Sequence, residues 1–229
     1  PRGRFGAMVL QVLDGSAFEF HGVKLLNLRA LDVQVPGLES LTLYGEVVVQ
    51  RGSDVDRGGV DNEGLGWYLE AAWKLPGGLA WAPLLTYRYA YFSGDDLATP
   101  ANEGYRPLFF GFYLRAWDTW YQGEVGGQYH VFNQNQVTQM LKLRTFPHPR
   151  VAATVYWYRH DLAERHYFRV PLASRAWADE INAGVEYFAG DRVYLYAGLV
   201  WSRPDRAAEQ FFGDDDEFAI VQTWMRFRF

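Results

Sequence analysis

Long runs in which apolar and polar residues alternate constrain the fold of this chain more than any other feature. Residues 63–75 show the pattern best, with Tyr68, Glu70 and Lys74 on the polar side. The apolar side consists of Leu65, Trp67, Leu69, Ala71, Trp73 and Leu75. Successive side chains of a β-strand point to opposite faces of the sheet, so each such run predicts a strand with one apolar face.

Segments of this kind recur along the whole chain. They span residues 5–14, 23–35, 39–51, 63–75, 79–92, 136–146, 150–160, 179–189, 192–203 and 217–229. Most reach about ten residues, which is enough to cross an outer membrane at a tilt, whereas strands of soluble proteins usually have about five or six. We therefore predict an all-β fold: an antiparallel up-and-down transmembrane β-barrel with about ten strands in this chain.

The composition narrows the classes of fold and function. Aromatic residues make up 17% of the 229 residues, and such side chains form girdles where a barrel crosses the membrane interfaces. The sequence has no run of about eighteen apolar residues, which excludes a transmembrane helix. Cysteine is absent and the net charge is -5, so thiolate chemistry is excluded and nucleic acid is not expected as a partner. Because no composition break marks a linker, we predict one domain over residues 1–229.

Loop lengths indicate the direction of each strand, because outer-membrane barrels alternate short periplasmic turns with long external loops. With Phe229 at the periplasmic side, the periplasmic turns are 36–38, 76–78, 147–149 and 190–191. The external loops are then 15–22, 52–62, 161–178 and 204–216. This alternation requires that no single strand crosses the membrane within 93–135, although residues 122–132 alternate like a strand. We predict that 93–135 is one long extracellular excursion, with a short helical turn near Arg115 to Gln122.

The central part of the chain carries its most distinctive motifs. They are YFSGDD (91–96), EGYRPLFFGFYLRAWDTWYQGEVGGQYHVFNQNQ (103–136) and LKLRTFP (141–147). The GY-x-PL-(F/Y)-(F/Y)-G opening, the W-x-T-W-x-QGE core and the paired Asn133 and Asn135 resemble the alginate export family of outer-membrane porins. The resemblance implies a monomeric barrel in the bacterial outer membrane that conducts a polyanionic polysaccharide through a basic lumen. It also implies about eighteen strands, of which this chain would form a C-terminal portion.

Basic side chains on the polar sides of the strands are the candidate substrate-binding residues. They are Lys74, Arg88, Lys142, Arg144, Arg226 and Arg228. In a pore such residues would replace part of the hydration of an anion by several weak contacts. Carboxylates also lie on the polar sides of the strands or in the long excursion 93–135. They are Glu46, Glu70, Glu124, Glu180 and Glu186. The alternative of equal weight is that the charges pair across neighbouring strands as structural ion pairs.

Other clusters of polar residues are weaker candidates. Asp95-Asp96 and Asp214–Asp216 could hold Ca²⁺, but acidic runs of this kind are more often solvated loop tips. A second group with metal-ligating side chains has no regular spacing and consists of His160, Asp161, Glu164 and His166. His130 has no serine near it that would suggest a hydrolase. We therefore predict no metal site, no cofactor and no catalytic residue.

Taken together, the patterns predict a non-enzymatic porin of a Gram-negative outer membrane. It would conduct anionic polysaccharide or small anionic solutes by passive diffusion, surrounded by the lipid bilayer and lipopolysaccharide, with periplasmic or outer-membrane proteins as further partners. One alternative is a structural barrel that anchors another outer-membrane component, and a less favoured one is an outer-membrane hydrolase. Because the chain opens with Pro1-Arg2-Gly3, we expect that an export signal has been removed or that the chain is a fragment of a longer one.

Overall fold

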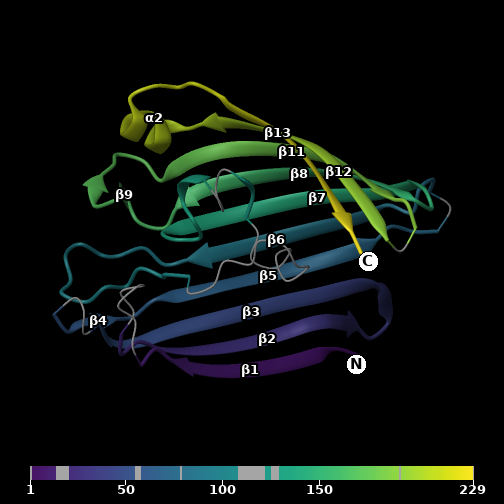
Figure 1. Ribbon diagram of the computed structural model, residues 1–229. Coiled ribbons are helices and arrows are strands. Elements are labelled where there is room, and N and C mark those ends of the chain that lie inside the picture. Colours follow the sequence, from purple (N-terminus) through teal and green to yellow (C-terminus); the bar gives the residue numbers. More distant parts are fainter. Residues whose placement is uncertain are drawn as a thin grey trace.

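The computed structural model of the protein describes residues 2–13, 21–54, 58–77, 79–107, 122–124, 129–190 and 192–228. The fold is all-β, and the described part of the chain is 63% strand with one bounded helix. Ten strands form an antiparallel up-and-down sheet in which neighbours in the sequence are neighbours in space (Figure 1). The predicted all-β, up-and-down architecture is confirmed. No helix among the described residues is long and apolar enough to cross a membrane.

The strands of the sheet follow the order of the sequence. They are β1 (Arg4–Gln11), β2 (Lys24–Val35), β3 (Leu38–Asp54), β5 (Leu65–Lys74), β6 (Leu84–Phe92), β7 (Gln136–His148), β8 (Val151–Leu162), β11 (Ala176–Phe188), β12 (Val193–Pro204) and β13 (Phe218–Phe227). Three short strands lie outside this path: β4 (Val60–Asn62) pairs with β3, and β9 (His166–Tyr167) pairs with β10 (Val170–Pro171). Each predicted segment overlaps one long strand of the sheet, and several strands extend beyond the predicted bounds.

Local backbone geometry moves several predicted boundaries. β6 begins at Leu84 and not at residue 79, because Trp81 and Ala82 have φ values of 69° and 44°, which are incompatible with a strand. β7 continues to His148, into the segment predicted as the turn 147–149. The bulge predicted in 23–35 is confirmed by a register shift between Ala30 and Val33.

A helix replaces part of the predicted acidic loop 204–216. α2 (Arg206–Phe212) begins after Asp205, whose side chain accepts a hydrogen bond from the backbone N–H of Arg206. The helix ends at Gly213, which has a φ of 82° and caps it in the left-handed conformation. Ala207 and Ala208 are buried against Trp177 and its apolar neighbours, so tertiary packing holds the helix on the sheet.

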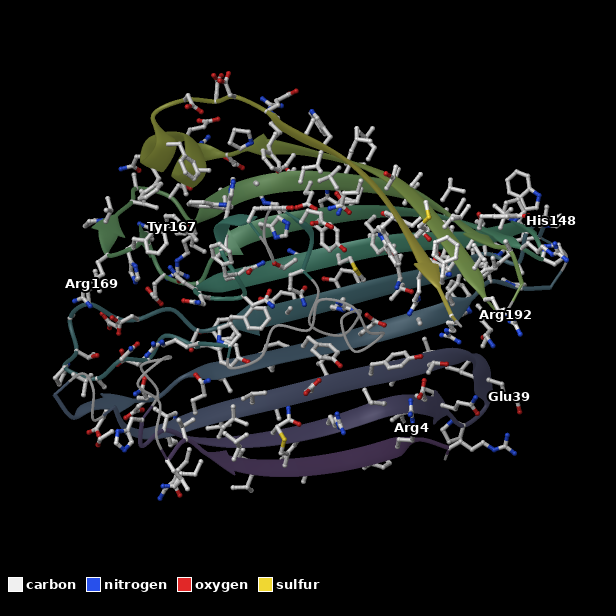
Figure 2. The ribbon with its side chains drawn as sticks, viewed as in Figure 1. Arg4, Glu39, His148, Tyr167, Arg169 and Arg192 are labelled. Carbon is white, nitrogen blue, oxygen red and sulfur yellow. The ribbon has the colours of Figure 1, made fainter. Side chains whose placement is uncertain are left out.

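The two ends of the sheet differ in their connections (Figure 1). The turns β2–β3, β5–β6, β7–β8 and β11–β12 gather at one end, where β1 begins and β13 ends; we call it the turn end. The connections that contain β4, β9 and α2 gather at the opposite end, the loop end. Figure 2 shows Arg4, Glu39, His148 and Arg192 at the turn end and Arg169 at the loop end, so charged side chains flank the sheet at both ends. The predicted sorting of connections by length is confirmed.

The connection between β6 and β7 has no strand in its described parts, which are 93–107, 122–124 and 129–135. The described residues of 122–132 therefore form no strand, as predicted. The predicted helical turn lies outside the described residues, apart from Gln122.

The sheet is curved but is not closed. Within the described part of the chain, β1 and β13 are its two edges and pair with no further strand. The structure thus establishes an open antiparallel sheet with two free edges among the described residues.

The two faces of the sheet reverse the usual distribution of side chains. One face, which we call the apolar face, exposes large hydrophobic residues. They include Leu69, Trp73, Leu141, Val155, Trp157, Ile181, Leu199, Val221 and Met225. The opposite face, the polar face, buries apolar side chains such as Tyr68, Phe92 and Met140 together with charged and polar ones. The charged and polar ones include Gln50, Thr86, Arg88, Thr138, His160, Glu180 and Asn182. Because water-soluble proteins bury apolar and expose charged residues, this reversal is the most informative feature of the fold.

Candidate functional site

A buried ion pair lies in the middle of the polar face. Arg88 on β6 and Glu70 on β5 are directly opposite each other in the sheet. Nε of Arg88 donates to Oε2 of Glu70 at 2.7 Å, and Nη2 lies 2.5 Å from the same oxygen. The guanidinium also lies over the ring of Tyr68, 5.4 Å from its centre. The two side chains are only 3% and 11% exposed, so Arg88 is a structural ion-pair partner and not a free cation.

The two predicted basic residues on β7 also have partners. Nη2 of Arg144 lies 2.7 Å from Oε2 of Glu186 on β11, across the intervening strand β8. Small side chains at Ala152 and Thr154 of β8 separate them in the register and leave room for this contact. Nζ of Lys142 lies 5.7 Å from the centre of the Tyr156 ring. At Arg88 and Arg144 the structure therefore favours the alternative of cross-strand pairing.

The remaining predicted basic residues lie toward the turn end and are exposed. Cζ of Arg226 is 5.4 Å from the centre of the Tyr194 ring on β12. Lys74 ends β5, and Arg228 follows β13. Among the described residues, no carboxylate forms an ion pair with Lys74, Arg226 or Arg228. Three of the predicted basic residues, Lys74, Arg226 and Arg228, thus have no carboxylate partner in the described part of the chain, and all three lie at the turn end.

A buried polar cluster nearer the loop end was not predicted from the sequence. His160 on β8 and Glu180 on β11 are fully buried, with Nε2 of the histidine 3.4 Å from Oε2 of the glutamate. Nδ1 of His160 lies 3.0 Å from the hydroxyl of Thr138. Oε1 of Glu180 accepts hydrogen bonds from the Asn182 amide at 2.6 Å and from the backbone N–H of Glu124 at 2.8 Å. The alternation of the sequence puts His160 and Glu180 on the polar sides of their strands. Their contact depends on the register between β8 and β11, which the alternation does not predict.

Gly123 allows the β6–β7 connection to reach this carboxylate. Its φ is 83°, and a Cβ atom at this position would lie 2.8 Å from both carboxylate oxygens of Glu180. Glycine is the residue that tolerates this backbone conformation and the close approach together. The QGE motif of residues 122–124 therefore attaches the connection to the polar face. Further along the face, Gln50 holds Arg106 through two hydrogen bonds to its backbone.

Replacing Gly123 by alanine should lower the free energy of unfolding by about 1–3 kcal/mol, because it adds left-handed strain and displaces the Glu180 carboxylate. Equilibrium denaturation of the refolded full chain would measure the effect. Gly77→Ala is the matched control, since no heavy atom lies within 4 Å of a Cβ at Gly77 and the control should change stability by less than about 0.5 kcal/mol. Equal effects of the two substitutions would contradict the attachment.

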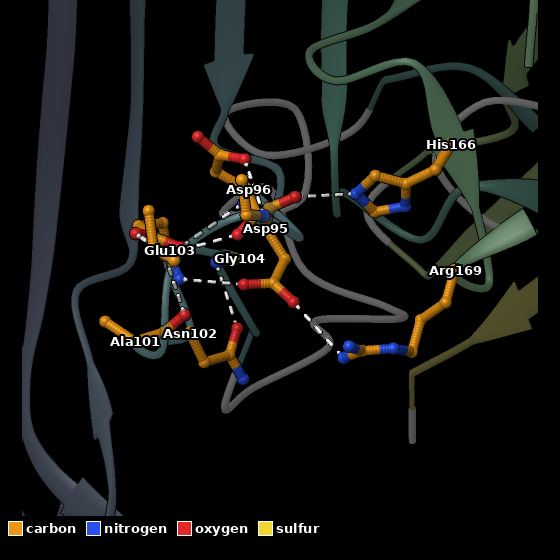
Figure 3. Close-up of polar contacts among 10 residues, drawn as sticks. Asp95, Asp96, Ala101, Asn102, Glu103, Gly104, His166 and Arg169 are labelled. Atoms are coloured by element: carbon orange, nitrogen blue, oxygen red, sulfur yellow. Dashed lines mark hydrogen bonds and ion pairs between the residues drawn. The ribbon is translucent and has the colours of Figure 1, made fainter. Parts of the chain in front are cut away.

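A second polar network joins two connections at the loop end (Figure 3). Nε2 of His166 lies 2.7 Å from the backbone carbonyl oxygen of Asp95, and because a carbonyl only accepts, this nitrogen donates. Nη1 of Arg169 lies 3.4 Å from Oδ2 of Asp95, and the backbone N–H of Glu103 donates to Oδ1 at 3.3 Å. Asp95 thus ties the β6–β7 connection to the β8–β11 connection, and Asn135 adds a second link through hydrogen bonds to the backbone of Glu164 and His166.

The pKa values of the two carboxyl groups of this network, those of Asp95 and Glu103, shift in opposite directions. Burial raises the pKa of Asp95, because it disfavours the charged carboxylate. Burial acts in the same sense on Glu103, but hydrogen bonds from the Thr99 hydroxyl and the Asp96 backbone outweigh it and lower the pKa of Glu103.

The acidic run considered as a Ca²⁺ site, Asp214–Asp216, is exposed. Among the residues that the structure describes, no group of three or more His, Asp or Glu side chains could hold a metal ion.

His130, considered as part of a hydrolase site, lies among aromatic rings. Its ring centre is 5.3 Å from that of Phe212, 5.9 Å from that of Phe218 and 6.4 Å from that of Trp177. Burial among them lowers the pKa of His130. These contacts give His130 a packing role at the loop end.

Comparison with known proteins adds no assignment: no protein-family model matches the sequence, and a search among curated proteins finds no similar sequence. The alginate-export resemblance therefore stays a prediction from the central motifs.

Proposed function

We propose that this chain forms a β-barrel wall in a bacterial outer membrane and lines a pore for anionic solutes. The observation that carries the proposal is the reversal of the two faces, with large apolar side chains exposed and charged side chains buried. Outer-membrane barrels have this distribution, because their outer surface contacts lipid and their interior contacts water. In water, an exposed apolar face of this extent would be an aggregation surface.

The lengths of the strands support the proposal that the sheet crosses a membrane. The strands from β7 to β12 in the sheet have twelve or thirteen residues each. A tilted strand needs about 9–11 residues to cross the hydrocarbon core. The edges β1 and β13 would have to pair, with each other or with further strands, because unpaired backbone groups cost several kcal/mol each in lipid. Closure into a barrel is therefore part of the proposal.

The choice of anionic solutes rests on the distribution of charge along the polar face. Arg88 and Arg144 are neutralised by Glu70 and Glu186, whereas Lys74, Arg226 and Arg228 at the turn end are not paired with carboxylates in the described part of the chain. Fixed positive charges at one mouth of a pore raise the local concentration of anions and select against cations. Anionic saccharides and small organic anions both fit this chemistry.

A structural or anchoring barrel is the second candidate, and a specific observation favours it. The polar face is covered in part by the β6–β7 connection, through Gln50 with Arg106 and through Glu180 with Glu124. A lumen occupied in this way would conduct weakly or not at all. Conductance therefore separates the two candidates.

Single-channel recording in a planar bilayer tests the proposal directly. We expect discrete conductance steps and a reversal potential that indicates anion preference in a KCl gradient. Changing Arg226 and Arg228 together to glutamate should shift that potential toward cation preference, because the charge at the turn end changes sign. Arg203→Glu, at the loop end of β12, is the control and should shift it much less. Absence of conductance would remove the pore, and cation preference of the unmodified chain would remove the anion assignment.

A further inference from the structure

Three aromatic rings lie side by side on the polar face near the turn end. Tyr194 and Tyr196 lie on β12 and Trp224 on β13, where Trp224 is directly opposite Tyr196 and Arg226 is opposite Tyr194. The ring centre of Trp224 is 4.9 Å from that of Tyr194 and 5.5 Å from that of Tyr196, with interplanar angles of 42° and 36°. Aromatic girdles of barrels face lipid, whereas these rings share a face with the charged residues Arg226 and Glu186.

Two glycines shape the surface beneath these rings. Gly184 on β11 and Gly198 on β12 are opposite each other in the sheet. A Cβ atom at Gly184 would lie 2.8 Å from the ring of Tyr196, and one at Gly198 would overlap the same side chain. The ring of Tyr196 therefore rests on bare backbone. This leaves an indole beside it that is 41% exposed.

Two charged side chains contact Tyr194, namely Glu186 and Arg226. The hydroxyl of Tyr194 donates to Oε1 of Glu186 at 2.7 Å, and Arg144 pairs with Oε2 of the same residue. Glu186 thus has both carboxylate oxygens occupied. Arg226, whose Cζ lies 5.4 Å from the centre of the Tyr194 ring, is exposed and has no carboxylate partner in the described part of the structure. An open indole and an unpaired guanidinium therefore lie next to each other on neighbouring positions of one strand face.

We propose that Trp224, Tyr196 and Arg226 form a binding subsite for a carboxylate that carries a ring. The ring would stack on the exposed indole, since the negative π face attracts C–H groups and the face of another ring. The carboxylate would pair with the guanidinium, whose planar fork matches its geometry. The subsite rests on the proposed function, in which the polar face lines the pore. A uronate sugar and an aromatic acid are two sources of the same chemistry.

Isothermal titration calorimetry on the refolded full chain in detergent micelles tests the subsite without requiring conductance. The probes are galacturonate and benzoate, with acetate as a carboxylate that has no ring and galactose and benzyl alcohol as rings without a carboxylate. We expect at least one ring-bearing carboxylate to bind more tightly than acetate and than its uncharged analogue. Binding of galacturonate alone would identify a sugar site, and binding of benzoate alone would identify an aromatic-acid site.

Two variants and a matched control locate the binding. Trp224→Ala should raise Kd about tenfold, and Trp224→Phe, which keeps an aromatic face, should bind nearly as the unmodified chain does. Arg226→Gln should abolish the preference for the charged ligand over its uncharged analogue. Trp157→Ala is the control, because Trp157 is 40% exposed but lies on the apolar face. It should leave Kd unchanged.

The outcomes separate the subsite from the pore. No binding of either ring-bearing carboxylate, or equal losses in Trp224→Ala and Trp157→Ala, would overturn the subsite even if the chain conducts. Binding that depends on Trp224 and Arg226 would support the subsite even if no conductance is observed, in which case the pore would be rejected and the site retained.

Discussion

Replacing Leu199 by arginine should lower the free energy of unfolding in a lipid bilayer by about 2–4 kcal/mol. Leu199 lies in the middle of β12, is 52% exposed on the apolar face and is opposite Ala183 and Val221 in the neighbouring strands. In the proposed barrel this position faces the hydrocarbon core, where a guanidinium loses its hydration and finds no partner. Denaturant titration of the chain refolded into phospholipid vesicles, followed by tryptophan fluorescence, would measure the change.

Gln222→Arg is the matched control for this substitution. Gln222 is on β13, opposite Gly198 and therefore on the polar face, where an added guanidinium stays in contact with water. We expect the control to change stability by less than about 1 kcal/mol. If the sheet instead faced water on its apolar side, Leu199→Arg would also cost only about 0.5 kcal/mol, as for a typical surface position. Equal and small effects would therefore reject the membrane proposal.

Replacing Glu70 by alanine should lower the free energy of unfolding by about 3–5 kcal/mol. The change removes the carboxylate that accepts a hydrogen bond from the buried guanidinium of Arg88 and forms an ion pair with it, and a buried charge that loses a close partner is costly. The contact of Arg88 with the Tyr68 ring offsets only a small part of this loss. The same vesicle titration would report it.

Two controls show whether the loss arises from an unpaired buried charge. Changing Glu70 and Arg88 together to methionine should recover much of the stability, because neither member of this ion pair then stays buried and charged without the other. Arg4→Gln breaks the ion pair between Arg4 and Asp32, whose side chains are 75% and 43% exposed, respectively. Because this pair is exposed, its loss should lower the free energy of unfolding by less than about 1 kcal/mol. If the double variant were as unstable as Glu70→Ala, the loss would come from packing and not from charge.

Alternation along the chain was sufficient to predict all ten strands of the sheet and the sorting of connections into a turn end and a loop end. It failed where backbone conformation or packing overrides the pattern. Trp81 and Ala82 look like strand residues but have positive φ, which delays the start of β6. α2 lies in a segment rich in charge, and the burial of Ala207 and Ala208 against Trp177 is a contact between distant parts of the chain.

The candidate site could be predicted only in part. Arg88, Lys142, Arg144 and Arg226 were placed on the polar face by their phase, but their different roles depend on neighbours in other strands. The sequence did not predict the pair of His160 with Glu180 or the aromatic cluster around Trp224. The signal for the cluster was present, since Tyr194 and Tyr196 alternate with outward apolar residues of β12, but nothing local shows which residue of β13 lies opposite.

What the sequence alone determined is the position of each strand and the identity of its two faces, because the two-residue period of a strand is a local property of the backbone. What only the tertiary structure decided is which charges meet. Register places Arg88 against Glu70, a small-residue gap on β8 lets Arg144 reach Glu186, and Gly123 brings the β6–β7 connection to Glu180. These contacts depend on strand offsets set over distances that no local pattern encodes, and they determine which cations are neutralised and which stay available at the turn end.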